Sequence, residues 1–257
     1  MTNINFINKL LREQEFVKIE NAYCPSSISK LKTKLDSFEK LVTDNSHKHD
    51  LTDRWYLKHR IDDGVLYDLY QRLPVVRSIC DDPILQDILA NFFQSPYYLY
   101  VNSYLFKPGD RDNVVPWHQD FLSRPNQSEK VIAWVSIDQT GPLNGELRVI
   151  PGSHRSGFRP MKVEPDKTHH TSVALNNDEK NDILDLETKP VDVNLFSNFL
   201  VHSSTQNSTG KPRRALRFAS KSLDDASLPR GSILMMGVDH NTYVSAPEKI
   251  KISKLLN

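Results

Sequence analysis

The spacing of apolar residues changes from helical to strand-like about a third of the way along the chain. In the first part, apolar positions recur three and four residues apart, with Ser26-Ser27 offering an N-cap and Pro83 suited to a first turn. This spacing predicts helices over 3–15, about 27–41, 65–72 and 83–93. Between the first two, the short apolar run Phe16–Ile19 predicts a strand.

After Ser95-Pro96 the chain becomes rich in aromatic and β-branched residues arranged in short runs. These runs predict strands over 97–106, 131–137, 147–150, 191–196, 199–202 and 215–220. Pairs such as Pro108-Gly109, Asn144-Gly145 and Thr209-Gly210 punctuate them and mark turns. Helices first and many short strands later predict a mainly β fold with flanking helices.

The length of 257 residues fits one domain, and neither repeats nor a linker interrupt it. We therefore expect a single domain over 1–257, with a helical flank at 1–95 and a strand-rich core at 96–220. The segment 155–189 is polar and weakly periodic. A loop of this length inside a compact domain is usually functional, so the segment is expected to form a lid or insert beside a substrate.

Charge and composition narrow the possible partners. Thirty-three basic and 32 acidic residues give a formal net charge of +1, which provides no attraction toward nucleic acid or an anionic membrane. No apolar run approaches the roughly 18 residues of a membrane span. Two cysteines, Cys24 and Cys80, do not make a disulfide framework, so a reduced, cytoplasmic setting is expected. The oligomeric state stays open.

The first candidate for chemistry is His118-Gln119-Asp120, followed far downstream by His202. Residues i and i+2 of a strand point to one face, so His118 and Asp120 are placed to bind one ion together. Two histidines and one carboxylate on one face of an iron, with other positions open, form the site of non-haem Fe(II) oxygenases. The third ligand has to come from another strand, which makes His202 the candidate.

Each of these residues also has an ordinary structural interpretation. One His-x-Asp is expected by chance in a chain with nine histidines, and His202 after an apolar run is commonly a strand-end histidine with a satisfied hydrogen bond. Two other clusters, His47-Lys48-His49-Asp50 and His169-His170, lie in polar segments and are interpreted as solvated loops.

The ordered motifs around the candidates decide between these interpretations. The chain carries, in order, His118-Gln119-Asp120, then Gly145-Glu146-Leu147-Arg148-Val149-Ile150-Pro151-Gly152-Ser153-His154, then His202 and Pro212-Arg213-Arg214. In these motifs it resembles the phytanoyl-CoA dioxygenase family of Fe(II)- and 2-oxoglutarate-dependent oxygenases, from about residue 16 to 247. The run Gly-x-Leu-x-Val-Ile-Pro-Gly-Ser-His and an arginine eleven residues after the distal histidine, here Arg213, are the specific features.

The resemblance implies a double-stranded β-helix, a jelly roll of cupin type, for the core at 96–220. It also implies that Fe(II) is bound by His118, Asp120 and His202, that Arg213 pairs with the far carboxylate of 2-oxoglutarate, and that O2 is consumed. Arginine suits that task because its planar fork bonds a carboxylate through two parallel hydrogen bonds. Whether Arg213 or Arg214 faces the site depends on strand register, and the family spacing selects Arg213.

Further cosubstrate contacts are implied residue by residue for Lys107, Ser103, Gln119, Trp134 and Ser204. The alternatives are a charged residue at a turn for Lys107 and a core side chain for Trp134. Gln119 conflicts with the strand argument, because a residue between His118 and Asp120 turns to the opposite face. Pro151-Gly152-Ser153 is expected to be a structural turn.

The implied reaction is hydroxylation of an unactivated C–H bond of a small metabolite, of secondary-metabolite or amino-acid type, with release of succinate and carbon dioxide. Desaturation, epoxidation and cyclisation share the same oxidative step. The carboxylate Asp120 argues against the halogenases of the family, in which Gly or Ala stands there. A competing class is a non-catalytic jelly-roll binding module. Phe121 and Arg124 follow the metal dyad and are candidates for the substrate pocket.

Two departures from the family pattern accompany the resemblance. The Gly-Asp pair before the strand that leads to the distal histidine is Val191-Asp192 here, which affects a turn rather than the site. Near the end, the run Gly237–Tyr243 resembles a tail motif of some bacterial members that act on small metabolites.

Overall fold

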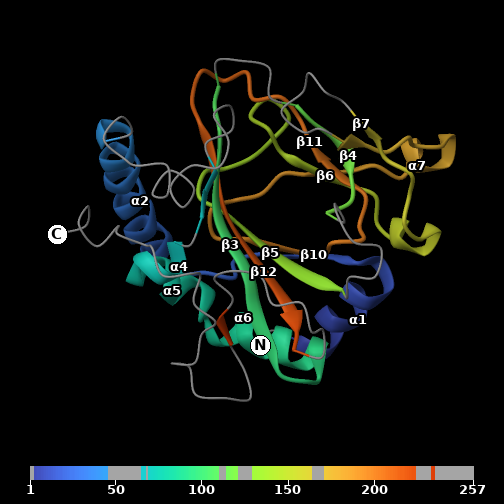
Figure 1. Cartoon of the computed structure of the whole chain (residues 1–257), viewed down its shortest axis with the longest axis horizontal. Coiled ribbons are helices and arrows are strands. Elements are labelled where there is room, and N and C mark those ends of the chain that lie inside the picture. The colour runs from blue at the N-terminus through green and yellow to red at the C-terminus, as the bar shows by residue number, and fades with distance from the viewer. Residues whose placement is uncertain are drawn as a thin grey trace.

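Two antiparallel sheets form the centre of the computed structural model, which describes residues 3–45, 65–67, 69–109, 114–120, 129–163, 171–223 and 233–234 (Figure 1). The larger sheet has the order β1 (Phe16–Ile19), β10 (Val193–Ser197), β5 (Lys130–Ser136), β12 (Arg213–Ser222), β3 (Tyr97–Lys107), β13 (Ile233–Leu234), and β2 (Val65–Tyr67) also pairs with β3. The smaller sheet has the order β4 (Val115–His118), β11 (His202–Ser204), β6 (Leu147–Val149), β9 (Leu184–Leu186). A separate pair is formed by β7 (Lys162–Val163) and β8 (Thr171–Ser172).

Helices cover the outer face of the larger sheet. They are α1 (Ile4–Gln14), α2 (Pro25–Asn45), α4 (Leu69–Arg72), α5 (Pro74–Cys80) and α6 (Pro83–Phe93). The short 3-10 helix η1 (Ser153–Ser156) follows β6, and α7 (Asn177–Asn181) lies between β8 and β9 in the chain. None of the helices that the structure describes has both the length and the apolar character that a membrane crossing requires.

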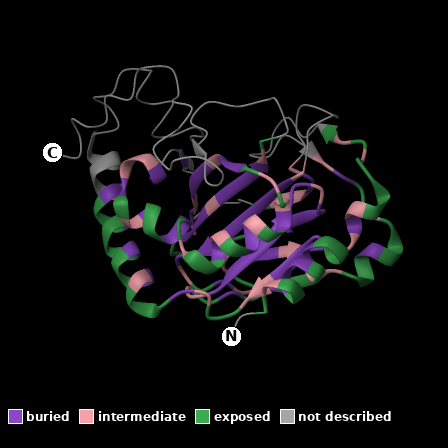
Figure 2. Ribbon diagram, turned by 90° about the horizontal axis from the view of Figure 1, so that it is seen from below, coloured by how far each residue is buried: buried purple, intermediate pink, exposed green. Residues whose placement is uncertain are grey.

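Alternation along the central strands builds two separate apolar layers. On β5, Val131, Ala133 and Val135 pack against the helices, whereas Ile132 and Trp134 lie in a second cluster with residues of the smaller sheet. All seven residues of β5 are buried, as expected for a strand covered on both faces. Figure 2 shows that buried residues concentrate in the strands at the centre of the molecule, whereas exposed residues lie mainly on the helices at its sides. Full burial of one such aliphatic side chain is worth about 1.5–3 kcal/mol, so this strand anchors both layers.

The same alternation places cations between the two sheets on β12. Leu216 and Phe218 belong to the helical layer, and Ala215 and Ala219 belong to the layer between the sheets. Arg213 and Arg217 share the parity of Ala215 and both border a pocket between the sheets. The functional site therefore lies on the inner face of the larger sheet.

Most predicted elements are confirmed, including the helices at α1, α2 and α6 and the strands at β1, β3, β5, β6, β10 and β12. The helix predicted over 65–72 is wrong for its first three residues, since Val65–Tyr67 form β2 and pair with Leu105–Ser103 of β3. The strand predicted over 199–202 is also wrong, because a turn occupies 198–200 and β11 begins at His202. Apolar runs as short as these have no periodicity that distinguishes a helix, a strand and a turn.

The polar segment 155–189 contains more regular structure than predicted. Its last part forms β9, which pairs with β6 at the edge of the smaller sheet, with Leu186 opposite Leu147. Just before it, the side chain of Asn176 accepts from the backbone amide of Glu179, and the side chain of Glu179 accepts from the backbone amide of Asn176. This pair of hydrogen bonds is a capping box that starts α7. Residues 164–170, which include His169-His170, lie outside the described residues.

Candidate metal and cosubstrate site

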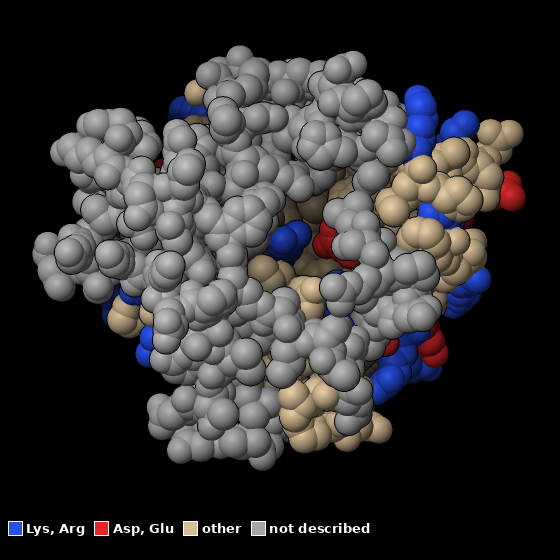
Figure 3. Space-filling view, in the orientation of Figure 1, with Lys and Arg blue, Asp and Glu red and all other residues tan. Residues whose placement is uncertain are grey.

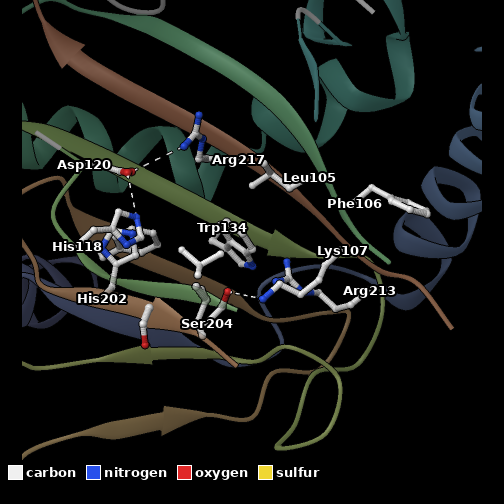
Figure 4. A pocket seen from close by; sticks show the side chains of 14 residues that line it. Leu105, Phe106, Lys107, His118, Asp120, Trp134, His202, Ser204, Arg213 and Arg217 are labelled. Atoms are coloured by element: carbon white, nitrogen blue, oxygen red, sulfur yellow. Dashed lines mark hydrogen bonds and ion pairs between the residues drawn. The ribbon is translucent and has the colours of Figure 1, made fainter. Parts of the chain in front are cut away.

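A pocket opens between the two sheets, and the surface above it is hollowed, with basic and acidic groups at its floor (Figure 3). It is lined by Leu105, Phe106, Lys107, Val115, His118, Asp120, Trp134, Leu147, Phe196, His202, Ser203, Ser204, Arg213 and Arg217. Its polar groups form two sets on either side of Trp134: His118, His202, Asp120 and Arg217 on one side, Ser204, Lys107 and Arg213 on the other (Figure 4).

Strand pairing brings the two candidate histidines together although 83 residues separate them in the chain. His202 of β11 is the register partner of His118 of β4, and their ring centroids lie 4.1 Å apart. Asp120 is the second residue after β4. One ligand atom from each of His118, Asp120 and His202 lies within 4.8 Å of the other two. The predicted convergence of these three residues is therefore present in the fold.

Both imidazoles are oriented by the backbone. Nδ1 of His118 lies 2.8 Å from the carbonyl oxygen of Pro116, and Nδ1 of His202 lies 2.9 Å from that of Leu200. A carbonyl oxygen only accepts, so each Nδ1 carries a proton and Nε2 is the ring nitrogen left to face the site. This is the arrangement in which metal-binding histidines are usually held, with the second ring nitrogen donating to a fixed acceptor.

The charge states of His202 and Asp120 also suit a divalent cation. Burial, and next the neighbouring His118, lower the pKa of His202 to about 4, so this imidazole is neutral near pH 7. Burial alone would raise the pKa of Asp120, but the hydrogen bond with His118 and the charges of His202 and Arg217 outweigh it and hold this pKa well below its usual range. An ionised carboxylate, a neutral imidazole and the ring of His118 thus face a common point.

Two buried cations stand at the other side of Trp134. The ammonium of Lys107 donates to Oγ of Ser204 at 2.7 Å and to the carbonyl oxygen of Thr205 at 2.6 Å. Arg213 is the register partner of Lys107 on the next strand, and its guanidinium carbon lies 5.3 Å from the centroid of the Trp134 ring. Lys107 is 6% exposed and Arg213 3% exposed, which is rare for such residues and indicates a site for an anion.

Gly145, the first residue of the motif Gly145–His154, leaves room for the side chain of Lys107. Its φ of +81° is accessible mainly to glycine, and a Cβ atom there would lie 2.5 Å from Cδ of Lys107. Asn207 holds the opposite side, since its amide donates to the carbonyl oxygens of Lys107 and Lys211 at 3.0 and 2.7 Å. The turn at Pro151-Gly152-Ser153 is structural as predicted, with Gly152 at a φ of +77°.

The structure distinguishes Arg213 from Arg214. Arg213 lines the pocket, whereas Arg214 points to the helical side. There Arg214 donates from Nε to Oδ2 of Asp138 at 2.8 Å and pairs with Asp36 of α2. The arginine selected by the family spacing is therefore the one that faces the pocket.

Two expected cosubstrate residues are not brought into the pocket lining. Ser103 accepts a hydrogen bond from Nε of Arg217 at 3.2 Å instead. Gln119 is fully buried, and its amide donates to the carbonyl oxygens of Gly157 and Phe199 at 3.2 and 2.7 Å. Its side chain thus turns away from the pocket, in agreement with the strand argument.

Several expected residues cannot be placed. Phe121 and Arg124, the two substrate candidates, lie outside the described residues, as do the cluster at 47–50 and the run 237–243.

Conversely, sequence reasoning overlooked Arg217, which lines the pocket beside Asp120. The signal was present, because Arg213, Ala215 and Arg217 alternate along one strand and so share one face.

Comparisons with known proteins agree with this geometry. The family model described as phytanoyl-CoA dioxygenase (PhyH) matches residues 11–215. An ectoine dioxygenase of Sphingopyxis alaskensis is 26% identical over 166 residues, which cover 58% of this chain and 54% of that protein. The chain thus matches about half the length of this curated relative.

Solved structures share the fold. The apo form of the non-haem monooxygenase ThoJ superposes with a TM-score of 0.74 at 17% identity, covering 97% of this chain and 92% of that one. The epimerase SnoN, solved in complex with Fe3+, alpha-ketoglutarate and nogalamycin RO, gives a TM-score of 0.65 at 15% identity, covering 96% of both chains.

Proposed function

Because the chain belongs to the phytanoyl-CoA dioxygenase (PhyH) family, we propose that it is an Fe(II)- and 2-oxoglutarate-dependent oxygenase that hydroxylates an unactivated C–H bond of a small metabolite. One observation carries the proposal. An ionised Asp120, a neutral His202 and the imidazole of His118 converge at one side of a pocket whose other side holds two buried cations.

The three convergent residues are assigned to the metal. Their donor set is the two-histidine, one-carboxylate combination that suits non-haem Fe(II) and leaves other positions open. The backbone carbonyls of Pro116 and Leu200 fix the rings so that each Nε2 faces the site. The residues therefore fit the ion that the family implies, without rearrangement of the backbone.

The cationic side of the pocket is assigned to 2-oxoglutarate. Arg213 would bind its far carboxylate through two parallel hydrogen bonds, and Lys107 would add a second positive charge. Ser204 and Trp134 border the same space, Ser204 by holding the ammonium of Lys107 and Trp134 by packing beside Arg213. Ser103 and Gln119 would support the site indirectly, through Arg217 and through the backbone at Gly157 and Phe199.

The proposed fold of the core is the double-stranded β-helix, within one domain. Two facing antiparallel sheets with the site between them support it. In this arrangement the metal ligands come from β4, from the second residue after it, and from β11 of the smaller sheet. Arg213 and Lys107 come from β12 and β3 of the larger one. The site would then assemble only when both sheets pack together.

Iron and 2-oxoglutarate, when bound, would supply the activation of O2, with the keto acid oxidised to succinate and carbon dioxide and the second oxygen atom transferred to the substrate. The residues of the chain hold the two reactants at fixed positions and exclude bulk water with the apolar walls Leu105, Leu147 and Phe196. A dry, preorganised site keeps the oxidant from consuming the protein or water instead of the substrate.

A free small molecule is proposed as the substrate. The names of the relatives support this class, since one acts on ectoine and SnoN was solved with nogalamycin RO. Desaturation, epoxidation or cyclisation would use the same site and differ only in how the substrate is placed.

The test is a screen of amino-acid-type and secondary metabolites with the full chain, Fe(II), ascorbate and 2-oxoglutarate. We expect one class to give a product that has gained one oxygen atom, with one succinate formed per product. A product that has lost two hydrogens would instead establish desaturation. Absence of both iron binding and succinate formation would favour a non-catalytic binding module.

A further inference from the structure

Arg217 stands next to the proposed metal ligands, and no role of its own is assigned to it above. It occupies the centre of the larger sheet, where its register partners are Ser103 on β3 and Trp134 on β5. Its side chain is 24% exposed and lines the pocket. A charged residue in the middle of a sheet, facing a site between two layers, requires a partner there.

The two carboxylate oxygens of Asp120 have different neighbours, and one of these neighbours is Arg217. Oδ1 of Asp120 lies 3.6 Å from Nε2 of His118, on the side of the three convergent residues. Oδ2 lies 3.8 Å from Nη1 of Arg217, on the opposite side (Figure 4). One oxygen therefore faces the metal position and the other faces the guanidinium.

Ser103 fixes the direction of the guanidinium. Its hydroxyl accepts from Nε of Arg217 at 3.2 Å, which leaves the terminal nitrogens directed along the pocket toward Asp120. Because the guanidinium is planar, one hydrogen bond at Nε restricts the positions of both terminal nitrogens. Ser103 and Arg217 thus form a short chain of contacts that ends on the carboxylate.

We infer that Arg217 is a positioning residue, which holds Oδ2 of Asp120 so that the carboxylate presents a single oxygen, Oδ1, to the metal. The inference rests on the proposed function, because it assigns Asp120 to the metal. Single-oxygen binding matters because a carboxylate that chelates through both oxygens would occupy a position needed by the cosubstrate or by O2.

A substrate anchor is the competing role for Arg217. An anionic group of a substrate bound to Arg217 would lie beside Oδ2 of the Asp120 carboxylate. Like charges at such a distance repel in a partly buried site. The geometry therefore favours Asp120 over an external anion as the partner of Arg217.

Mn(II) binding to the metal-free full chain tests the inference, with free Mn(II) measured by electron paramagnetic resonance. Residues that orient metal ligands commonly contribute about tenfold to a hundredfold to affinity, so we expect Arg217→Met to weaken Mn(II) binding by at least about tenfold. Arg217→Lys, which keeps the charge without the fork, and Ser103→Ala should fall between this variant and the wild type. At saturating metal, the KM for 2-oxoglutarate should stay within about twofold.

The sign of the effect separates positioning from simple electrostatics. The positive charge of Arg217 by itself repels a cation, so its removal would tighten Mn(II) binding if the residue did not orient Asp120. Arg148→Met is the matched control, because Arg148 pairs with Asp185 and does not line the pocket. It should leave the Mn(II) affinity unchanged.

Unchanged or tighter Mn(II) binding in Arg217→Met would overturn the inference, as would a raised KM for 2-oxoglutarate or substrate with intact metal binding. If Arg217→Met does not fold, as judged by circular dichroism, Ser103→Ala decides: a normal Mn(II) affinity in that variant overturns the inference. A wild type that binds no Mn(II) at all would contradict the proposed function itself.

Discussion

Two adjacent arginines on β12 show how one residue of register separates a functional role from a structural one. Arg213 faces the pocket beside Lys107 and Trp134, and Arg214 faces the helices and pairs with Asp138 and Asp36. The alternation of a strand assigns the two identical side chains to opposite faces. Each should therefore affect a different measurable property.

We expect Arg213→Met to raise the KM for 2-oxoglutarate by roughly tenfold to a hundredfold, because a charge-assisted contact is worth about 1.5–3 kcal/mol. Its free energy of unfolding should change little. Arg214→Met should do the reverse and lower the free energy of unfolding by about 2 kcal/mol, since it leaves Asp138 with fewer partners. Steady-state kinetics and urea unfolding of both variants give the comparison, and an equal loss of stability in both would contradict it.

At the scale of residues, the three candidate metal ligands could be named from the sequence, whereas the contacts that support them could not. His118, Asp120 and His202 lie in motifs with fixed spacing, which a single sequence displays. Gln119 lies in the same tripeptide, but its side chain serves the backbone at Gly157 and Phe199, 38 and 80 residues away. Such partners are determined by the folded chain, because any buried amide requires acceptors wherever they happen to lie.

Among the elements, the junction of α1 and β1 carries an unusual acid. Glu15 ends the helix with a φ of +53° and is 7% exposed. Its backbone carbonyl accepts from the amide of Ser197, so the junction is tied to β10. Burial raises the pKa of its carboxyl group to about 7, against a smaller lowering by a hydrogen bond with Ser197 and with a further rise from Glu129.

This raised pKa predicts a pH dependence of stability. Between the ordinary value of 4.5 and about 7, the folded state holds a proton at Glu15 that the unfolded state has lost. The free energy of unfolding therefore falls as pH rises through this window and levels off above it. This contribution is absent in Glu15→Gln. The free energy of unfolding of the variant, relative to that of the wild type, should therefore increase by on the order of 1–2 kcal/mol as the pH rises from 4.5 to 8.

Urea unfolding at several pH values measures the difference, with Glu13→Gln, an exposed acid of the same helix, as control. A constant offset between Glu15→Gln and the wild type across the whole range would contradict the assignment of this titration to Glu15.

The elements were predicted well where they are long and periodic, and poorly where they are short. α1, α6 and β3 fall within a residue of their predicted ends. In contrast, Val65–Tyr67 became a strand because β3 offers them an edge to pair with, and β9 formed because β6 did. Pairing partners remote in sequence decided these short segments, and no local pattern contains that information.

On the scale of the whole molecule, the site depends on the packing of two sheets. The larger sheet supplies Lys107, Trp134 and Arg213, and the smaller sheet supplies His202 and Ser204. The order of the strands could not be read from the chain, although its mainly β character could. Once the sheets pack, residues from between positions 105 and 217 meet around one pocket, which explains why the motifs are scattered along the sequence.

We propose that this pocket couples the oxidation of 2-oxoglutarate to the reduction of O2 through a metal held by His118, Asp120 and His202. Succinate formation measures this coupling. It is compared between the purified full chain and its Asp120→Ala variant, each with Fe(II), ascorbate and 2-oxoglutarate. We predict iron-dependent succinate formation by the wild type and a loss of at least about a hundredfold in the variant, because removing a ligand should cost no less than disturbing its support. An Asp120→Ala variant that forms succinate at the rate of the wild type would contradict the account.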